Sequence, residues 1–289
     1  MFYGNLRAGR KGEVIRAISA VDIALWDIMG KAVDKPLYKL LGGYRDKVPV
    51  YASGGYYQES KGIDGLVKEM TSYVEQGFKA VKMKIGRLSI KEDVERVKAV
   101  REAIGDDIQL MVDANSAFDA STAIRLARKL EEYDIFWFEE PVPPYDLDGY
   151  AKVTKASRIP IAAGESEFTR FGFRELITKG GVEIIQPDVS RAGGISECKK
   201  ITAIASAYNL SYTPHTGASG AVNIAASLQL AAGISNFLIF EYMYPPNPLR
   251  EEILQEPLPK PENGYITISD KPGLGIKLDE KAVSRYLKY

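Results

Sequence analysis

The sequence is poor in several residue types, and each scarcity excludes a class of protein. It has one cysteine, Cys198, among 289 residues, so no internal disulfide can form and we expect a reducing, cytoplasmic compartment. Lys and Arg number 38, as do Asp and Glu, so the chain has no excess positive charge to hold nucleic acid. No apolar run approaches the length of a membrane span, and no apolar core follows the basic segment Met1–Gly12 as in a secretory signal. We therefore expect neither a nucleic-acid nor a membrane partner.

What the sequence does have is a repeating order of short β-rich runs and amphipathic helical stretches. Eight runs predict strands: Val48–Ser53, Ala80–Gly86, Ile108–Ala114, Ile135–Pro141, Ile159–Gly164, Glu183–Val189, Leu210–Pro214 and Phe237–Met243. Apolar residues recur at helical spacing between them, as in Asp64–Gln76, Lys91–Ile104, Thr122–Tyr133 and Ile195–Tyr208. Strands that alternate with helices pair in parallel through right-handed crossovers. The pattern predicts an α/β fold.

An ionisable residue stands at the carboxyl end of seven consecutive predicted strands. These residues are Lys84, Asp113, Glu139, Glu165, Asp188, His215 and Glu241, at intervals of 29, 26, 26, 23, 27 and 26 residues. In a (β/α) barrel such positions converge on one mouth, where catalytic residues lie. In an open doubly wound sheet they would be spread along an edge and would not all meet. The predicted fold is therefore a TIM-like (β/α)7β barrel.

The two ends of the chain lie outside this repeat. Residues 1–47 contain the long amphipathic helix Glu13–Lys31, and residues 246–289 follow a proline-rich link. We expect residues 48–245 to form the catalytic barrel. The first segment is predicted to be a helical remnant of a capping domain, toward which the last segment returns.

Asp113, Glu139 and Glu165 end three neighbouring strands. A single carboxylate at such a position is often only the N-cap of the next helix. Three carboxylates at one mouth repel each other strongly if bare, and Mg²⁺, which takes oxygen ligands, relieves that repulsion. We predict a metal site from these three residues. Glu140 is a poorer ligand candidate, because strand alternation turns it to the opposite side.

Lys82 and Lys84 share one face of a strictly alternating strand. The outer face of a barrel packs on helices and must be apolar, so both lysines are expected to point inward. We expect lowered pKa values for them beside a metal, which suits a lysine that acts as a general base.

His215 is the only histidine, and it ends the strand next to the one that Asp188 ends. The two side chains are expected to meet, and a carboxylate bonded to one ring nitrogen fixes the tautomer and raises basicity. Glu241, at the end of the last strand, either contacts the substrate or forms a structural salt bridge. A lysine and a His/Asp pair on opposite sides of a cation can remove or return a proton next to a carboxylate, while the metal stabilises the enolate.

With these residues in place, the chain resembles the enolase superfamily, in its mandelate racemase subgroup. The resemblance is carried by Lys82-Met83-Lys84, Val112–Asn115, Phe138–Pro141, Ala163–Glu165, Gln186–Asp188 with Gly193-Gly194, Pro214-His215 and Phe240-Glu241. The muconate-cycloisomerase-like subgroup has a lysine on strand six, where this chain has Asp188, so that subgroup is disfavoured.

The resemblance implies a role for each of these positions. Asp113, Glu139 and Glu165 would bind Mg²⁺; Lys84 and the Asp188–His215 pair would be catalytic; Lys82, Asn115 and Glu241 would contact or support the substrate. Family members resemble a two-domain design whose N-terminal α+β domain covers the mouth. We expect this chain to lack most of that domain.

Three functions remain open from the sequence. The first is Mg²⁺-dependent dehydration of a sugar acid, favoured because a fixed cation and a polar mouth suit polyhydroxy acids and because the resemblance implies many such members. The second, with the same residues, is racemisation or epimerisation of an α-hydroxy acid. The third is a truncated or non-catalytic barrel. The expected partners are a small carboxylate substrate and further copies of the chain.

Overall fold

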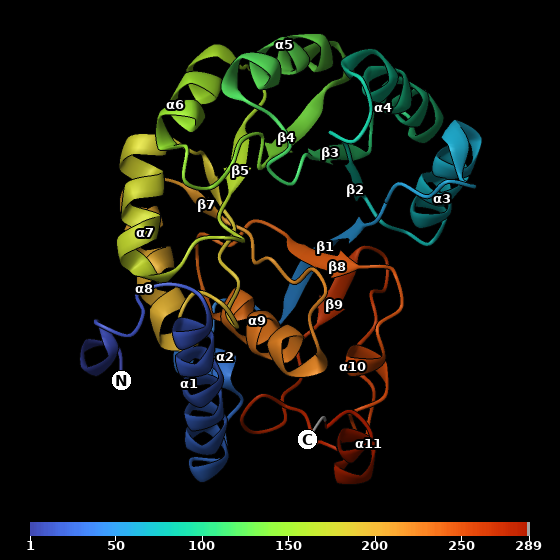
Figure 1. Ribbon diagram of the computed structural model, residues 1–289. Helices are drawn as coiled ribbons and strands as arrows, with labels where there is room; N and C mark the ends of the chain where they lie inside the picture. The colour runs from blue at the N-terminus through green and yellow to red at the C-terminus, as the bar shows by residue number, and fades with distance from the viewer. Residues whose placement is uncertain (288–289) are drawn as a thin grey trace.

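The computed structural model describes residues 1–287, and within them eight parallel strands follow one another in a curved sheet (Figure 1). Their order in the sheet is β7-β6-β5-β4-β3-β2-β1-β8. The strands are β1 Lys47–Ser53, β2 Ala80–Lys84, β3 Gln109–Asp113, β4 Ile135–Glu139, β5 Ile161–Ala163, β6 Ile184–Ile185, β7 Ser211–Tyr212 and β8 Phe240–Met243. All eight predicted strands are confirmed; β1 begins one residue earlier than predicted, and the other seven are shorter, β6 the most.

The sheet closes between β7 and the segment just before β8. Tyr212 forms a parallel bridge with Phe237. The Tyr212 N–H donates to the Asn236 carbonyl at 2.9 Å, and the Leu238 N–H donates to the Tyr212 carbonyl at 2.8 Å. The closed (β/α)7β barrel predicted from the in-phase ionisable residues is therefore confirmed.

Helices lie outside the strands and cover the barrel (Figure 1). They are α3 Gly62–Glu75, α4 Ile90–Ile104, α5 Ala120–Leu130, α6 Leu147–Ala156, α7 Thr169–Glu175, α8 Gly194–Ala207 and α9 Ala221–Gly233. Local sequence sets where several begin: Ser89 and Glu92 form a reciprocal capping box at α4, and Asp119 caps α5. No helix within residues 1–287 is both long and hydrophobic enough to cross a membrane.

Two apolar regions pack on the two faces of the sheet. The larger lies between the strands and the surrounding helices. The smaller fills the barrel interior below the mouth, and we call it the floor cluster: Tyr51, Ala80, Met111, Trp137, Ala162, Ile184 and Ile239. Inward positions therefore change from apolar in the floor cluster to charged at the mouth, which lets the barrel be a packed core and still carry a site.

The two ends of the chain pack against the barrel and against each other. The N-terminal part forms α1 Glu13–Ala32 and α2 Leu37–Leu41, and the C-terminal part forms α10 Pro248–Glu251, β9 Tyr265–Thr267 and α11 Glu280–Ser284. Strand β9 pairs antiparallel with β1. The Leu37 N–H donates to the Gly273 carbonyl, and the Gly273 N–H donates to the Lys35 carbonyl, each at 3.0 Å. The C-terminal segment thus ties the N-terminal helices to the first barrel strand.

Gly30 gives a direct test of that packing. A Cβ at Gly30 would lie 2.7 Å from the Cα of Gly273 and 2.7 Å from a Leu37 methyl group. We expect Gly30→Ala to lower the free energy of unfolding by about 1–3 kcal/mol, because backbone cannot move aside as a side chain can. Gly65→Ala is the control: that helical glycine faces only the flexible Lys61 side chain, so the helix propensity of Ala should make it neutral or stabilising. Urea unfolding measures both.

Candidate active site

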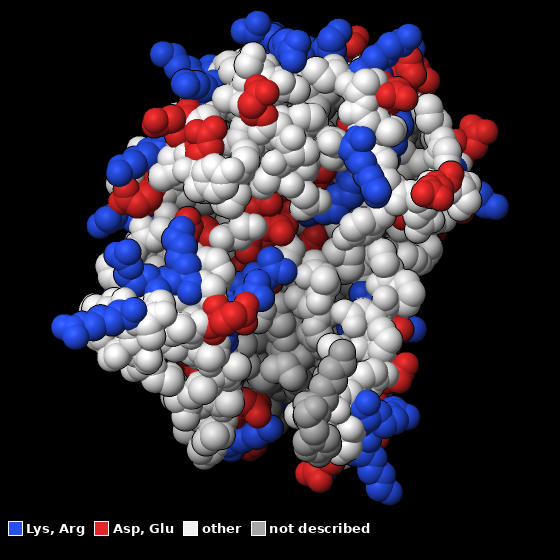
Figure 2. Space-filling model, in the orientation of Figure 1, with Lys and Arg blue, Asp and Glu red and all other residues white. Residues whose placement is uncertain are grey.

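Three predicted metal ligands come together at the barrel mouth. Asp113 and Glu139 are the last residues of β3 and β4, and Glu165 stands two residues after β5. One carboxylate oxygen of each lies within 4.8 Å of the others. Figure 2 shows acidic side chains gathered in a depression near the middle of this face. Carboxylate oxygens are the donors that Mg²⁺ prefers, so the donor set fits a hard divalent cation.

Both lysines of β2 point into the barrel, as the alternation predicts. Lys82 Nζ lies 2.7 Å from Glu139 Oε1, 2.9 Å from Glu241 Oε1 and 3.6 Å from Asp113 Oδ2. Lys84 Nζ lies 2.5 Å from Asp113 Oδ2. Burial acts to lower the pKa of each lysine, but the carboxylates outweigh it, so both pKa values are raised. The lowered pKa values are predicted for lysines beside a bound metal and stay a prediction; in the present arrangement each ammonium is paired with carboxylates.

Asp188 and His215 form the predicted pair. His215 Nδ1 is 2.8 Å from Asp188 Oδ2, while Nε2 lies 3.3 Å from Glu165 Oε2. The other Asp188 oxygen accepts hydrogen bonds from Ser190 and Asn223. Burial acts to lower the pKa of His215, but Glu165 and Asp188 outweigh it and raise the pKa to about 9. The imidazole is thus fixed in orientation, with Nε2 directed toward the metal-site carboxylates.

The residues predicted to contact substrate differ in access. Glu241 is 2% exposed, and its second oxygen accepts the Thr216 N–H at 2.7 Å, so both oxygens have protein partners. Lys82 is equally enclosed. Asn115 is exposed at the rim, and its backbone N–H donates to Asp113 Oδ1 at 2.8 Å. Of these three, Asn115 is the one whose side chain is open to solvent.

Glu140 is a further buried carboxylate beside this site. It does not belong to the three gathered ligands, as predicted, but its φ of 39° ends the extended conformation there. Strand alternation therefore does not set the direction of its side chain. Burial and the neighbouring Glu165 raise its pKa to about 8. The geometric reason for expecting Glu140 to be a poorer ligand therefore does not apply, and that expectation stays a prediction.

Arg191 is a site residue that the sequence reasoning missed. Its Nε lies 3.4 Å from Asp188 Oδ2, and a terminal nitrogen lies 3.7 Å from Glu165 Oε1. The guanidinium thus joins the histidine's partner to a predicted metal ligand. Arg191 stands on a turn three residues after Asp188, outside the strand-end positions that signalled the others, so the interval pattern gave no sign of it.

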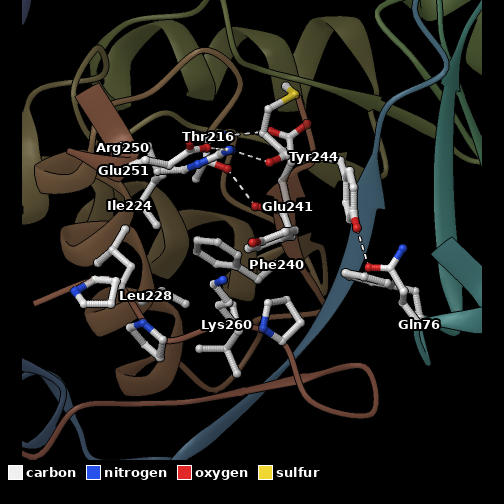
Figure 3. A pocket seen from close by; sticks show the side chains of 18 residues that line it. Gln76, Thr216, Ile224, Leu228, Phe240, Glu241, Tyr244, Arg250, Glu251 and Lys260 are labelled. Atoms are coloured by element: carbon white, nitrogen blue, oxygen red, sulfur yellow. Dashed lines mark hydrogen bonds and ion pairs between the residues drawn. The ribbon is translucent and has the colours of Figure 1, made fainter. Parts of the chain in front are cut away.

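A separate cavity of about 610 Å³ lies behind the last barrel strand (Figure 3). Phe240 and Tyr244, Leu228 of α9 and Lys260 of the C-terminal segment line it. Glu241 also borders it, but its carboxylate is bonded to Lys82 and Thr216. None of the three gathered carboxylates lines this cavity, so it is distinct from the predicted metal site.

Sequence comparisons identify the family of this chain. Residues 65–282 match the family Enolase C-terminal domain-like, and residues 6–42 match the Mandelate racemase / muconate lactonizing enzyme, N-terminal domain. The arabinonate dehydratase of Saccharolobus solfataricus is 41% identical over 286 residues, which span 99% of this chain and 76% of that protein. Other relatives, 36–37% identical, are named L-talarate/galactarate, D-xylonate, L-rhamnonate and D-galactonate dehydratases.

Solved structures show the same fold. The 3,6-anhydro-D-galactonate cycloisomerase of Zobellia galactanivorans superposes with a TM-score of 0.93 at 41% identity, over 100% of this chain and 80% of that one. A racemase from Streptomyces coelicolor, solved with bound magnesium, gives a TM-score of 0.89 at 37% identity, over 99% of this chain and 76% of that one. The chain therefore belongs to the enolase superfamily, in its mandelate racemase subgroup.

Proposed function

We propose that this enzyme dehydrates a sugar acid to a 2-keto-3-deoxy acid with the help of Mg²⁺. One observation carries the proposal: two proton-transfer groups stand at the two ends of the carboxylate triad, which is Asp113, Glu139 and Glu165. Lys84 contacts Asp113 at one end, and His215 contacts Glu165 at the other. A substrate held over the triad would have one such group on each side.

The steps follow from these positions. When bound, Mg²⁺ would stabilise the negative charge that builds on the substrate carboxylate. Because Asp113 outweighs burial and raises the pKa of Lys84, Lys84 Nζ would act as the neutral amine that takes the proton on the carbon next to that carboxylate once a bound cation takes up the Asp113 charge. His215 Nε2 gives its proton to the β-hydroxyl, which leaves as water, and the resulting enol tautomerises to the keto acid. Asp188 holds the imidazole through Nδ1.

The remaining site residues support this chemistry. Asn115, exposed at the rim, is placed to bond a substrate hydroxyl. Lys82 is paired with both Glu139 and Glu241, so Lys82 and Glu241 would hold the metal ligand and the floor of the site rather than touch substrate. Relatives named as sugar-acid dehydratases and the magnesium in a neighbouring structure support the substrate class and the cation.

The test is a screen of aldonic and aldaric acids with Mg²⁺ in D₂O. We expect one or a few acids to yield a 2-keto-3-deoxy product, detected by mass spectrometry and as its semicarbazone. Exchange of the α-proton and inversion without keto-acid product would replace the proposal with racemisation, for which the same two groups suffice. If no acid gives product and no acid exchanges its α-proton, the chain is a barrel that folds without turnover.

A further inference from the structure

A tryptophan lies directly beneath one of the carboxylates of the triad. Trp137 and Glu139 are two residues apart on β4, so their side chains point to the same, inward face. The indole Nε1–H of Trp137 donates to Glu139 Oε2 at 3.0 Å. Neither residue has any measurable solvent exposure. The hydrogen bond is therefore formed in a site from which water is excluded.

The floor cluster holds the indole in place. Tyr51 packs against the Trp137 ring edge-to-face, with 5.3 Å between ring centroids, and Phe136 packs against it at 5.4 Å. Because protein interiors are close-packed, a buried ring with such neighbours has little freedom to rotate. The position of the N–H is thus set by the apolar floor and not by the charged groups above it.

The other partner of Glu139 is a cation. Lys82 Nζ donates to both carboxylate oxygens, at 2.7 and 2.8 Å. An ammonium competes with a metal ion for the same negative charge, because both are cations. A neutral N–H orients the carboxylate without cancelling its charge. Groups that orient metal ligands in this way commonly contribute about 10–100-fold to metal affinity.

We propose that Trp137 is a positioning residue for the metal site: its indole N–H fixes the plane of the Glu139 carboxylate and thereby strengthens Mg²⁺ binding. The inference rests on the proposed Mg²⁺ site. Through Trp137, the apolar floor cluster would thus contribute to cation binding, although its residues are almost all hydrophobic.

The sharpest test replaces only the N–H. Trp137 is exchanged for benzothienylalanine, which has sulfur in place of the ring N–H, in a Trp26→Phe background that leaves one tryptophan site. Mg²⁺ affinity is measured by calorimetry on the full chain. We expect binding about 10-fold weaker than in the parent with Trp137. In the parent, we also expect the single indole N–H resonance to shift as Mg²⁺ is added.

Trp137→Phe gives a simpler variant, and Phe138→Leu is its control. Phe138 is also fully buried on β4 but packs on the outer face, away from Glu139. We expect both variants to lower Tm and only Trp137→Phe to weaken Mg²⁺ binding. An affinity for the benzothienyl protein within twofold of a Mg²⁺-binding parent would overturn the role of Trp137 alone. A parent that binds no Mg²⁺ would overturn the metal site and this inference together.

Discussion

Replacing Glu139 by Gln is expected to lower kcat/KM for the sugar acid by about a thousandfold or more. Gln keeps the shape of the side chain and removes one of the three charges that lie within 4.8 Å of one another. Losing one group that stabilises a developing oxyanion commonly costs about 10²–10³ in rate, and losing the cation costs more. Lys82 retains Glu241 and Asp113 as partners in this variant, so the barrel should still fold.

Thermal unfolding separates metal loss from misfolding in that variant. A ligand that binds only the folded state raises Tm by mass action, so millimolar Mg²⁺ should raise the Tm of the native chain above its value in EDTA. Glu139→Gln should show a much smaller rise. Glu132→Gln, the same change at an exposed position, is the control and should respond like the native chain. An unchanged native Tm in EDTA and in Mg²⁺ would contradict a metal site at the triad.

Replacing His215 by Asn should have the second largest effect, and it should separate loss of the β-hydroxyl from removal of the α-proton. We expect dehydration to fall by about 10²–10⁴, the usual contribution of a general acid or base. Exchange of the α-proton with D₂O should continue, because Lys84 lies at the opposite end of the triad, against Asp113. The comparison is Lys84→Met, which should lose exchange and dehydration together.

Proton exchange is followed by NMR, and keto acid by semicarbazone formation, on the same samples. Both variants should keep the Tm response to Mg²⁺, since neither removes a triad carboxylate. If His215→Asn abolishes exchange while Lys84→Met leaves it, the base and the acid are assigned the wrong way round.

Much of this fold could be predicted because the relevant signals are periodic. Ionisable residues from Lys84 to Glu241 recur once per strand–helix unit, and parallel strands bring such positions to one end of a barrel. Strict alternation likewise predicted that Lys82 and Lys84 face inward. Both features depend only on the spacing of residues, which can be read directly from the sequence.

Features that depend on particular side-chain pairs could not be predicted. The pKa of Lys82 is raised because Glu139 and Glu241, from two other strands, both reach it. Arg191 bridges Asp188 and Glu165 from a turn that has no periodic position. Glu140 leaves the extended conformation with a positive φ, which alternation cannot anticipate. Each depends on local geometry and long-range packing, not on spacing.

The pairing of β1 also constrains when this barrel can form during synthesis. Strand β1, near the start of the chain, is flanked by β8 and bordered by β9, both of which leave the ribosome only after residue 239. Until then one edge of β1 has unpaired backbone groups, the kind of edge that pairs wrongly with other chains. Contacts between residues so far apart in sequence also form slowly. Closure of the barrel therefore waits until β8 has been made, and until then the free edge of β1 is exposed to wrong pairing.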